Sequence, residues 1–471
     1  MKRRFFAPSH ALAILAKLGL AGPGTDDEQT PFSGRLEGRI ARVPSYLAPL
    51  LVLATVLVTT AAHAHEYVIR EVMSGLVSPR GLAFGPDGGL YVAEAGSGGD
   101  VNSPSIILGS GNRAYYGTTG GLSRLLNGVQ ERVLDNLPSL SATNPRGLEA
   151  SGLSDIVFDG SGTAFGVMGL GANPALRADL GAPGADFSTL VRLPLDGSPL
   201  ERIADLGTHE IASNPDGGLR DSNPFGMALA PDGRFLVADA GANDFLSVTA
   251  AGDVSTLGVL PNRPNPLPFG PPSFQSVPTS IAVGPDDAYY IGQLTGFPFP
   301  PGAANVYRFD PATDELTVAY GGFTNISDLT FDENGDLYVL QLTTNGLASA
   351  TPGPGALIKI DSRTGERATI ASEGLLFPGS VEAGPDGVLY VTNQITSAAG
   401  QVLSLTLLPP GIVNNPGLDG RIPPGLENGL PRGARHAVPE PTSAALSLLG
   451  CSICCFWRRQ QRRMAARPSR K

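Results

Sequence analysis

Two aspartates hold the same place in two copies of a repeated segment. A strand–turn–strand segment recurs six times, and the second residues of its copies are Gly81, Asp155, Gly226, Ser280, Asp328 and Ser380. Asp155 and Asp328 stand three copies apart, so they face each other if the copies form a ring. Two carboxylates converging on a narrow channel attract a cation such as Ca²⁺ or raise each other's pKa. We therefore predict a metal site at Asp155 and Asp328; the alternative is that each carboxylate caps a loop amide.

A second set of polar residues follows the second strand of several copies. Its members are Glu94, Asp239, Asn243, Asp244 and Asn393. Because they follow equivalent strands, we interpret these residues as a second candidate cluster. Asp and Asn are also common turn residues, because their side chains bond to nearby backbone amides. A purely structural role is therefore the alternative.

Other residue types that catalysis commonly uses are scarce in the body of the chain. His209 is the only histidine in residues 67–435, and all three cysteines follow residue 450. One histidine cannot supply a His-pair metal site, and a body without cysteine has no disulfide and no thiol nucleophile. No Gly-rich βαβ fingerprint or haem motif is present. We predict no catalytic residue and no cofactor except possible Ca²⁺.

Acidic residues dominate the body of the chain. The whole chain carries a net charge of −10, but 14 of its 33 basic residues lie in residues 1–64 and 437–471. Lys359 is the only lysine between these ends. An acidic surface repels phosphate backbones, so we expect no nucleic-acid partner. Solubility alone is a sufficient reason for the charge; weak attraction for cations is the alternative.

The repeated segments must be held by a fold with internal symmetry. The six copies are Arg80–Gly96, Ser154–Gly171, Phe225–Gly241, Thr279–Leu294, Ser327–Leu342 and Gly379–Gln394. Each has an apolar alternation, a turn such as Pro-Asp-Gly and a second strand, and most are followed by two more strands. Four-strand units repeated around a ring are the blades of a propeller, whereas a β-sandwich gives no reason for one turn to recur. We predict an all-β, six-bladed propeller over residues 65–410.

The two ends of this body predict how the ring closes. The last copy is followed by only one more strand, Gln401–Leu407, and an orphan strand, Glu66–Leu76, precedes the first copy. Pairing the orphan as the outer strand of the last blade completes four strands there. It also removes open sheet edges, which invite aggregation.

The N-terminal residues 1–64 read as a leader with a signal peptide. The apolar run Tyr46–Thr60 follows three arginines and precedes the small-residue tripeptide Ala62–Ala64. This order is typical of an export signal, with cleavage before His65. An uncleaved membrane anchor is the alternative, although the run is short for a membrane span.

The C-terminal residues read as a linker and a tail. Residues 411–437 are rich in Pro, Gly and Asn, as a flexible linker is. In residues 438–471, Pro439, Glu440 and Pro441 are followed by the apolar run Thr442–Trp457 and an arginine cluster. We expect this run to form a short membrane helix with a basic stop on the cytoplasmic side.

This tail resembles the PEP-CTERM sorting signal of Gram-negative bacteria. The resemblance covers the tripeptide, the apolar run and the arginine cluster in order at the end of the sequence. It implies an exosortase as a partner that recognises and removes the tail. With the signal peptide, it implies an exported protein of the cell envelope or exterior, transiently anchored by the C-terminal helix.

The body resembles the ScyD/ScyE family of bacterial proteins. The matching stretches include TGFPFPPGAANVYR (295–308) and NPALRADLG (173–181), together with the PDGxLYV turns, and they extend over residues 75–407. The resemblance implies an extracytoplasmic propeller and no defined reaction. The sorting tail is an addition to the family pattern.

Two classes of function remain. The first is a non-catalytic envelope or matrix propeller that binds a small molecule or an envelope component. The second is a metal-dependent hydrolase resembling gluconolactonases, which are six-bladed propellers with a central metal. Those enzymes have more Glu, Asn and Asp at the channel than the two Asp, two Ser and two Gly found here, which favours the first class.

Overall fold

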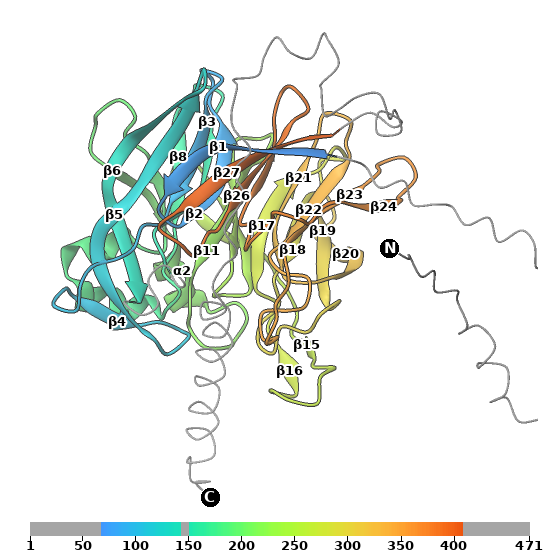
Figure 1. Ribbon diagram of the computed structural model, residues 1–471. Helices are drawn as coiled ribbons and strands as arrows, with labels where there is room; N and C mark the ends of the chain where they lie inside the picture. Colours follow the sequence, from blue (N-terminus) through green and yellow to red (C-terminus); the bar gives the residue numbers. More distant parts are fainter. Residues whose placement is uncertain (1–66, 143–149, 408–471) are drawn as a thin grey trace, which may run out of the picture. The chain divides into compact units, whose positions relative to one another are not determined.

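Six antiparallel sheets are arranged around a central axis (Figure 1). This computed structural model describes residues 67–142 and 150–407. The first strands of neighbouring blades contact each other all the way round the ring. The predicted six-bladed β-propeller is confirmed.

Several predictions concern parts of the chain outside this description. The leader and signal peptide (1–64), the linker (411–437) and the sorting tail (438–471) with its Pro-Glu-Pro motif all lie outside the described residues. They stay predictions. Within the described part of the chain, no helix is long and apolar enough to cross a bilayer.

Every blade runs from an inner strand at the axis to an outer strand, and the bounds follow. Blade 1 holds β2 (Pro79–Phe84), β3 (Leu90–Glu94), β4 (Ser105–Ile107), β5 (Arg113–Leu126) and β6 (Val129–Ala142); blade 2 holds β7 (Leu153–Phe158), β8 (Ala164–Met168), β9 (Thr189–Arg192) and β10 (Glu201–Asp205); blade 3 holds β11 (Pro224–Leu229), β12 (Phe235–Asp239), β13 (Asp244–Val248) and β14 (Val254–Val259). Blade 4 holds β17 (Pro278–Val283), β18 (Tyr289–Gln293), β19 (Ala304–Asp310) and β20 (Glu315–Phe323); blade 5 holds β21 (Ile326–Phe331), β22 (Leu337–Gln341), β23 (Ala356–Ile360) and β24 (Arg367–Ala371); blade 6 holds β25 (Val381–Ala383), β26 (Leu389–Asn393), β27 (Gly400–Leu407) and β1 (Tyr67–Leu76).

The recurrent turn joins the inner strand of each blade to the second strand. Its aspartate accepts a hydrogen bond from a backbone amide two residues on, as Asp87 does from Gly89 at 3.0 Å. The next turn residue is left-handed, with φ of 75° at Gly88. Blade 4 has Asp287 there with φ of 60°, which Asp tolerates better than most side chains. The turn chemistry expected from the sequence is therefore present.

The ring closes as predicted. β1 pairs antiparallel with β27, from Tyr67 opposite Leu407 to Leu76 opposite Gly400. β1 also contacts blade 1, because the Gln130 side chain accepts from the Ser74 amide at 3.0 Å and donates to its carbonyl at 2.9 Å. The N-terminal strand therefore links the last blade to the first.

The hydrophobic core is divided among the interfaces between blades. A buried cluster lies at every one of the six interfaces. Aromatic pairs cross five of them, with ring centroids 4.7–5.5 Å apart; these pairs are Tyr91–Phe158, Phe165–Phe235, Phe245–Phe309, Tyr290–Phe331 and Phe84–Tyr390. Such contacts add to the free energy of area burial. Each blade is therefore stabilised by both of its neighbours.

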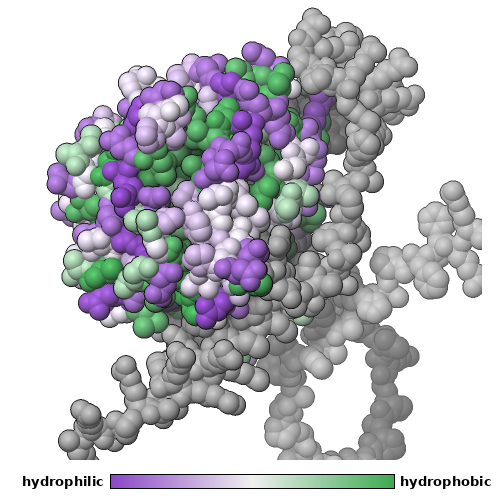
Figure 2. Space-filling view, turned by 90° about the vertical axis from the view of Figure 1, so that its left-hand side faces the viewer, coloured by the Kyte–Doolittle hydropathy of each residue, from purple (hydrophilic) through white to green (hydrophobic). Residues whose placement is uncertain are grey.

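Insertions between strands carry the remaining elements. The 3₁₀ helices η1 (Pro174–Leu180) and η2 (Ala182–Asp186) lie in blade 2, and β15 (Arg263–Pro264) pairs with β16 (Ser273–Phe274) in a projecting hairpin (Figure 1). α2 (Leu206–Ser213), which the repeat does not predict, leads from blade 2 to blade 3. Figure 2 shows the side that carries β5 and β6, where hydrophobic residues are dispersed among hydrophilic ones.

Substituting Met73 tests the closing strand. Met73 is 2% exposed and packs between blades 6 and 1. We expect Met73→Ala to lower the free energy of unfolding by about 2–4 kcal/mol, because it removes buried surface and leaves a cavity. Ser74→Ala, on the exposed neighbour, is the control, with a change within about 0.5 kcal/mol. Equal effects in chemical denaturation would contradict a closing role for β1.

Candidate functional site

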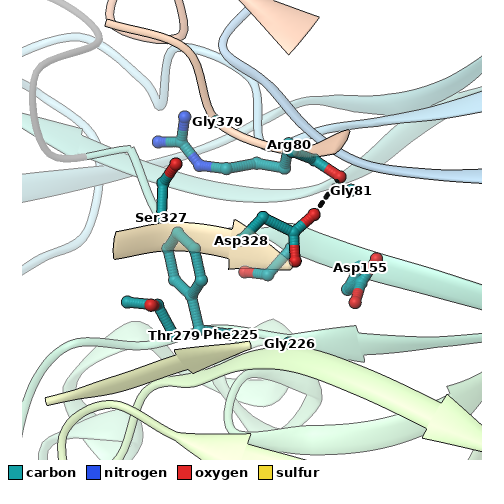
Figure 3. Close-up of a pocket in the computed structure, with 11 residues that line it drawn as sticks. Arg80, Gly81, Asp155, Phe225, Gly226, Thr279, Ser327, Asp328 and Gly379 are labelled. Atoms are coloured by element: carbon teal, nitrogen blue, oxygen red, sulfur yellow. Dashed lines mark hydrogen bonds between the residues drawn. The ribbon is translucent and has the colours of Figure 1, made fainter. Parts of the chain in front are cut away.

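The residues predicted to line the axis converge at one end of the channel (Figure 3). They surround a cavity of about 20 Å³, room for roughly one water molecule or a single ion. All six blades contribute to its lining, which consists of Arg80, Gly81, Ser154, Asp155, Phe225, Gly226, Thr279, Ser327, Asp328, Gly379 and Ser380. Five of the six predicted positions are in this set, and the sixth, Ser280, is buried beside Gly226.

A bulge aims these side chains at the axis. In blades 1 to 5 the pairing of the inner strand with the second strand shifts register near the strand's start, for example between Leu153 and Asp155 and between Ile326 and Asp328. A bulge re-aims a side chain and leaves backbone groups unpaired in the ladder. The inward direction of the side chains at the axis therefore depends on a bulge that recurs in five of the six blades.

Asp155 connects the inner strands of blades 2 and 3. Its Oδ2 accepts a hydrogen bond of 2.7 Å from the Met227 amide on β11. Its Oδ1 accepts one of 2.9 Å from the amide of Ile156, the next residue on β7. Both carboxylate oxygens thus have backbone donors.

Asp328 plays the equivalent part between blades 5 and 6. Its Oδ2 accepts from the Val381 amide at 2.9 Å and from the Ser380 hydroxyl at 2.6 Å, while its Oδ1 accepts from the Leu329 amide at 2.8 Å. The backbone-capping alternative accounts for these contacts, although each aspartate caps one amide of its own strand and one of the next blade's strand, and none in a loop. The metal site at Asp155 and Asp328 stays a prediction.

The glycine at the same position in blade 1 makes room for the first of these carboxylates. A Cβ atom at Gly81 would overlap Oδ1 of Asp155. A Cβ at Gly226 would likewise press on the backbone of Thr279 and Ser280 in blade 4. Glycine at these two positions therefore leaves room for the neighbouring blade.

A third carboxyl group, which the sequence analysis missed, shares the channel. Glu382 lies on β25, two residues beyond Ser380. Burial raises the pKa of Glu382 to about 8 with help from the charge of Asp328, and burial raises the pKa of Asp328 to about 6. The pKa of Asp155 is raised well above its usual range by burial, then by Asp328. The available signal was an acidic residue in a strand position that is Ala, Val or Thr in the other copies.

Glu382 also borders a larger cavity at the other end of the inner strands. This cavity has a volume of about 450 Å³ between the turns of blades 1, 5 and 6. Its lining consists of Phe84, Gly85, Gly88, Phe331, Asp332, Glu333, Asn334, Glu382, Ala383, Gly384, Pro385 and Gly387. Three carboxyl groups, two aromatic rings and no basic side chain line it.

Arg80 crosses the small cavity without a carboxylate partner within ion-pair distance in the described part of the chain. Its guanidinium donates to the carbonyls of Ile395 at 2.8 Å and Ala150 at 3.0 Å. Burial lowers the pKa of Arg80 to about 10. Arg80 therefore ties loops of neighbouring blades together.

The second predicted set of polar residues does not form one cluster. Glu94 in blade 1 forms an ion pair with Arg132 at 2.9 Å and accepts from the Ser123 hydroxyl at 2.6 Å. Asn393 in blade 6 accepts from the Leu376 amide at 2.7 Å. These two residues have the structural role given as the alternative.

The members from blade 3 do lie together. Asp239, Asn243 and Asp244 come from the ends of β12 and β13 and the turn between them. Asp239 accepts from the Asn223 amide and the Ser222 hydroxyl, each at 2.6 Å. The sequence analysis missed the acidic residues that α2 and the following loop bring to them, Glu210, Asp216 and Asp221; their signal was three acids within twelve residues after the only histidine of the body.

The carboxyl groups of this cluster have raised pKa values, because they are buried close to one another. Burial and the charges of neighbouring carboxylates raise the pKa of Glu210 and of Asp221 to about 7. The same causes raise the pKa of Asp244 well above its usual range. Within residues 67–142 and 150–407, no three His, Cys, Asp or Glu side chains stand together at metal-ligand spacing. A cation at either set of carboxylates therefore needs other oxygen ligands as well.

Comparisons with known proteins find only distant likenesses. No family model and no curated protein matches the chain. Among solved structures it is similar to a streptogramin B lyase (13% identity, 74% of this chain and 100% of that one, TM-score 0.39) and to a putative gluconolactonase (13%, 72% and 92%, 0.42). It is also similar to a Bacteroides thetaiotaomicron protein of unknown function (11%, 72% and 77%, 0.45). These likenesses are too distant to carry an argument about activity.

Adding a methyl group at Gly81 tests the packing of the column. We expect Gly81→Ala to lower the free energy of unfolding by about 1–3 kcal/mol, because the new Cβ must displace the Asp155 carboxylate and its bond to Met227. Gly160→Ala is the matched control, since its Cβ would meet nothing within 4 Å. Thermal and denaturant unfolding measure both. A Gly81 variant as stable as the control would mean that Asp155 does not occupy this space.

Proposed function

We propose that this chain is an exported, ScyD/ScyE-like propeller that binds a small organic cation in the 450 Å³ cavity at the turn end of its channel. The predicted signal peptide and the tail that resembles a PEP-CTERM signal support the proposal of export and sorting by an exosortase. The observation that carries the binding proposal is the lining of the cavity, in which carboxyl groups and aromatic rings meet with no positive charge among them.

The chemistry of the cavity fits a cationic head group. Phe84 and Phe331 offer aromatic surfaces, which attract cations through the negative faces of their rings. Glu382 supplies a carboxyl group whose pKa of about 8 falls when a cation binds, because an opposite charge favours the ionised form. A volume of about 450 Å³ is within the range of small-molecule sites.

Choline, with its uncharged isostere 3,3-dimethyl-1-butanol, tests the proposal. We expect choline to bind more tightly at pH 9 than at pH 6, because Glu382 gains its charge across this interval. The isostere should bind weakly and without pH dependence. Glu382→Gln should weaken choline binding at pH 9 roughly tenfold, about 1.4 kcal/mol, and remove its pH dependence. Titration calorimetry measures each affinity.

The matched control is Glu373→Gln, an exposed glutamate outside the lining. It should bind choline as the unsubstituted protein does. Equal affinity for choline and the isostere, or an unchanged pH profile in Glu382→Gln, would refute recognition of a cation at this cavity.

A lactonase-like hydrolase is the second candidate, favoured by a specific observation. Asp328 and Glu382 share one channel, and their pKa values of about 6 and about 8 lie on either side of neutrality. At pH 7 one is mainly a base and the other mainly an acid, the pairing that acid–base catalysis uses.

A panel of sugar lactones with added Ca²⁺ tests the hydrolase. If the protein hydrolyses any of them, Asp328→Asn should lower kcat about 100-fold or more, because the base is lost. Circular dichroism of the variant must show an intact fold. Turnover that survives Asp328→Asn, or no turnover of any lactone in the panel, would speak against a hydrolase centred on this pair.

A further inference from the structure

Outside the channel, five carboxylates have no positive partner among the residues that the structure describes. Glu210 lies on α2, Asp216 and Asp221 on the loop that follows, and Asp239 and Asp244 on blade 3. None of the five forms an ion pair with Lys, Arg or His in the described part of the chain. The nearby basic groups are engaged elsewhere: Arg177 with Asp205 at 2.9 Å, and Arg220 with the Ile211 carbonyl at 3.0 Å.

Several oxygens of this group are buried without a hydrogen-bond donor. They are both carboxylate oxygens of Glu210 and one oxygen each of Asp221, Asp244 and Asn214, the residue that ends α2. Glu210 is 2% exposed and Asp244 is 1% exposed, so water does not reach them freely. A buried polar atom without a partner is costly, and here five acceptors in one region lack donors.

Two other carboxylates of the group, Asp239 and Asp216, have hydrogen-bond donors. Asp239 accepts bonds from a hydroxyl and three backbone amides, and Asp216 accepts from the Asn243 side chain at 2.9 Å and the Gly218 amide at 2.7 Å. No hydrogen bond of normal geometry reaches the oxygens of Glu210 and Asp244 named above, although the Asp221 amide lies near the Glu210 carboxylate. A metal cation can satisfy such oxygens directly, and the neighbouring carboxylate charges favour a positive ion at this place.

We propose that Glu210 and Asp244 bind a calcium ion that joins the α2 insertion to blade 3, at a site separate from the channel. Ca²⁺ takes six to eight oxygen ligands in flexible geometry. Two carboxylates supplemented by amide, carbonyl or water oxygens meet this need, and Asn214 offers an amide oxygen beside α2. This set does not require three acidic ligands, which the described residues do not bring together.

An ion at this site would connect the segment between blades 2 and 3 to blade 3. α2 and its loop connect the outer strand of blade 2 to the inner strand of blade 3. When both carboxylates are ionised and no cation is bound, Glu210 on α2 and Asp244 on blade 3 repel each other. With calcium bound, the same charges hold α2 in place, so calcium should stabilise the whole propeller.

Calcium titration of the full chain, first treated with EDTA, tests the proposal. Calorimetry should show binding, and the midpoint of thermal unfolding should rise with CaCl₂. Glu210→Gln and Asp244→Asn should each weaken calcium affinity at least tenfold. Glu373→Gln, at an exposed glutamate outside this group and outside the channel, is the matched control and should bind calcium as the unsubstituted protein does.

Each other outcome overturns the proposal. No heat and no stabilisation with the unsubstituted protein would mean that protons, not calcium, satisfy the cluster. Affinity retained in Glu210→Gln and lost in Asp328→Asn would place the ion in the channel. Glu210→Gln should fold at least as well as the unsubstituted protein in EDTA, because it removes a repelling charge, so failure to fold would contradict the argument.

Discussion

The pairing of the first strand with the last is the constraint on which the rest of the structure depends. Glu71 on β1 and Gln401 on β27 are 330 residues apart and hydrogen-bonded through their side chains. Without β1 the cluster between blades 6 and 1 loses Met73 and Leu76. Because every blade is stabilised by two neighbours, an open ring would leave blades 1 and 6 each with one covered face. The shape of the channel therefore depends on closure of the ring by β1 and β27.

Much of this fold could be predicted because the same local chemistry recurs. A turn that needs Asp and a left-handed residue, between short apolar strands, indicates a repeated unit, and the orphan strand at Tyr67–Leu76 indicates how the units close. Asp155 and Asp328 were found for the same reason, since the repeat assigns them equal places. Their bonds to Met227 and Val381 were not predicted, because they depend on bulges that put the next blade's amide within reach.

The parts that could not be predicted break the repeat. Glu382 differs from its counterparts in an inner strand, and its importance depends on the nearby charge of Asp328. Glu210 comes from α2, an element that starts where the Asp205 side chain accepts from the Thr208 amide at 2.8 Å and that no other blade has. The sequence repeat predicts which residues occupy equivalent positions in the blades. It does not predict which residues of an inserted segment, such as α2, contact those positions. Both residues belong to acidic groups without a positive partner, which only the folded arrangement assembles.

The order of strands along the chain affects how the polypeptide can fold as it is made. Synthesis from the N-terminus delivers β1 first and β27 last. β1 must then wait, with its edge unpaired, until five blades and most of the sixth have emerged. Its sequence, YVIREVMSGL, places two charges among the apolar residues of that waiting edge. Charged side chains on an unpaired strand discourage pairing with the wrong partner. The strand that closes the folded ring, β1, thus also carries the charges that discourage aggregation before the ring is complete.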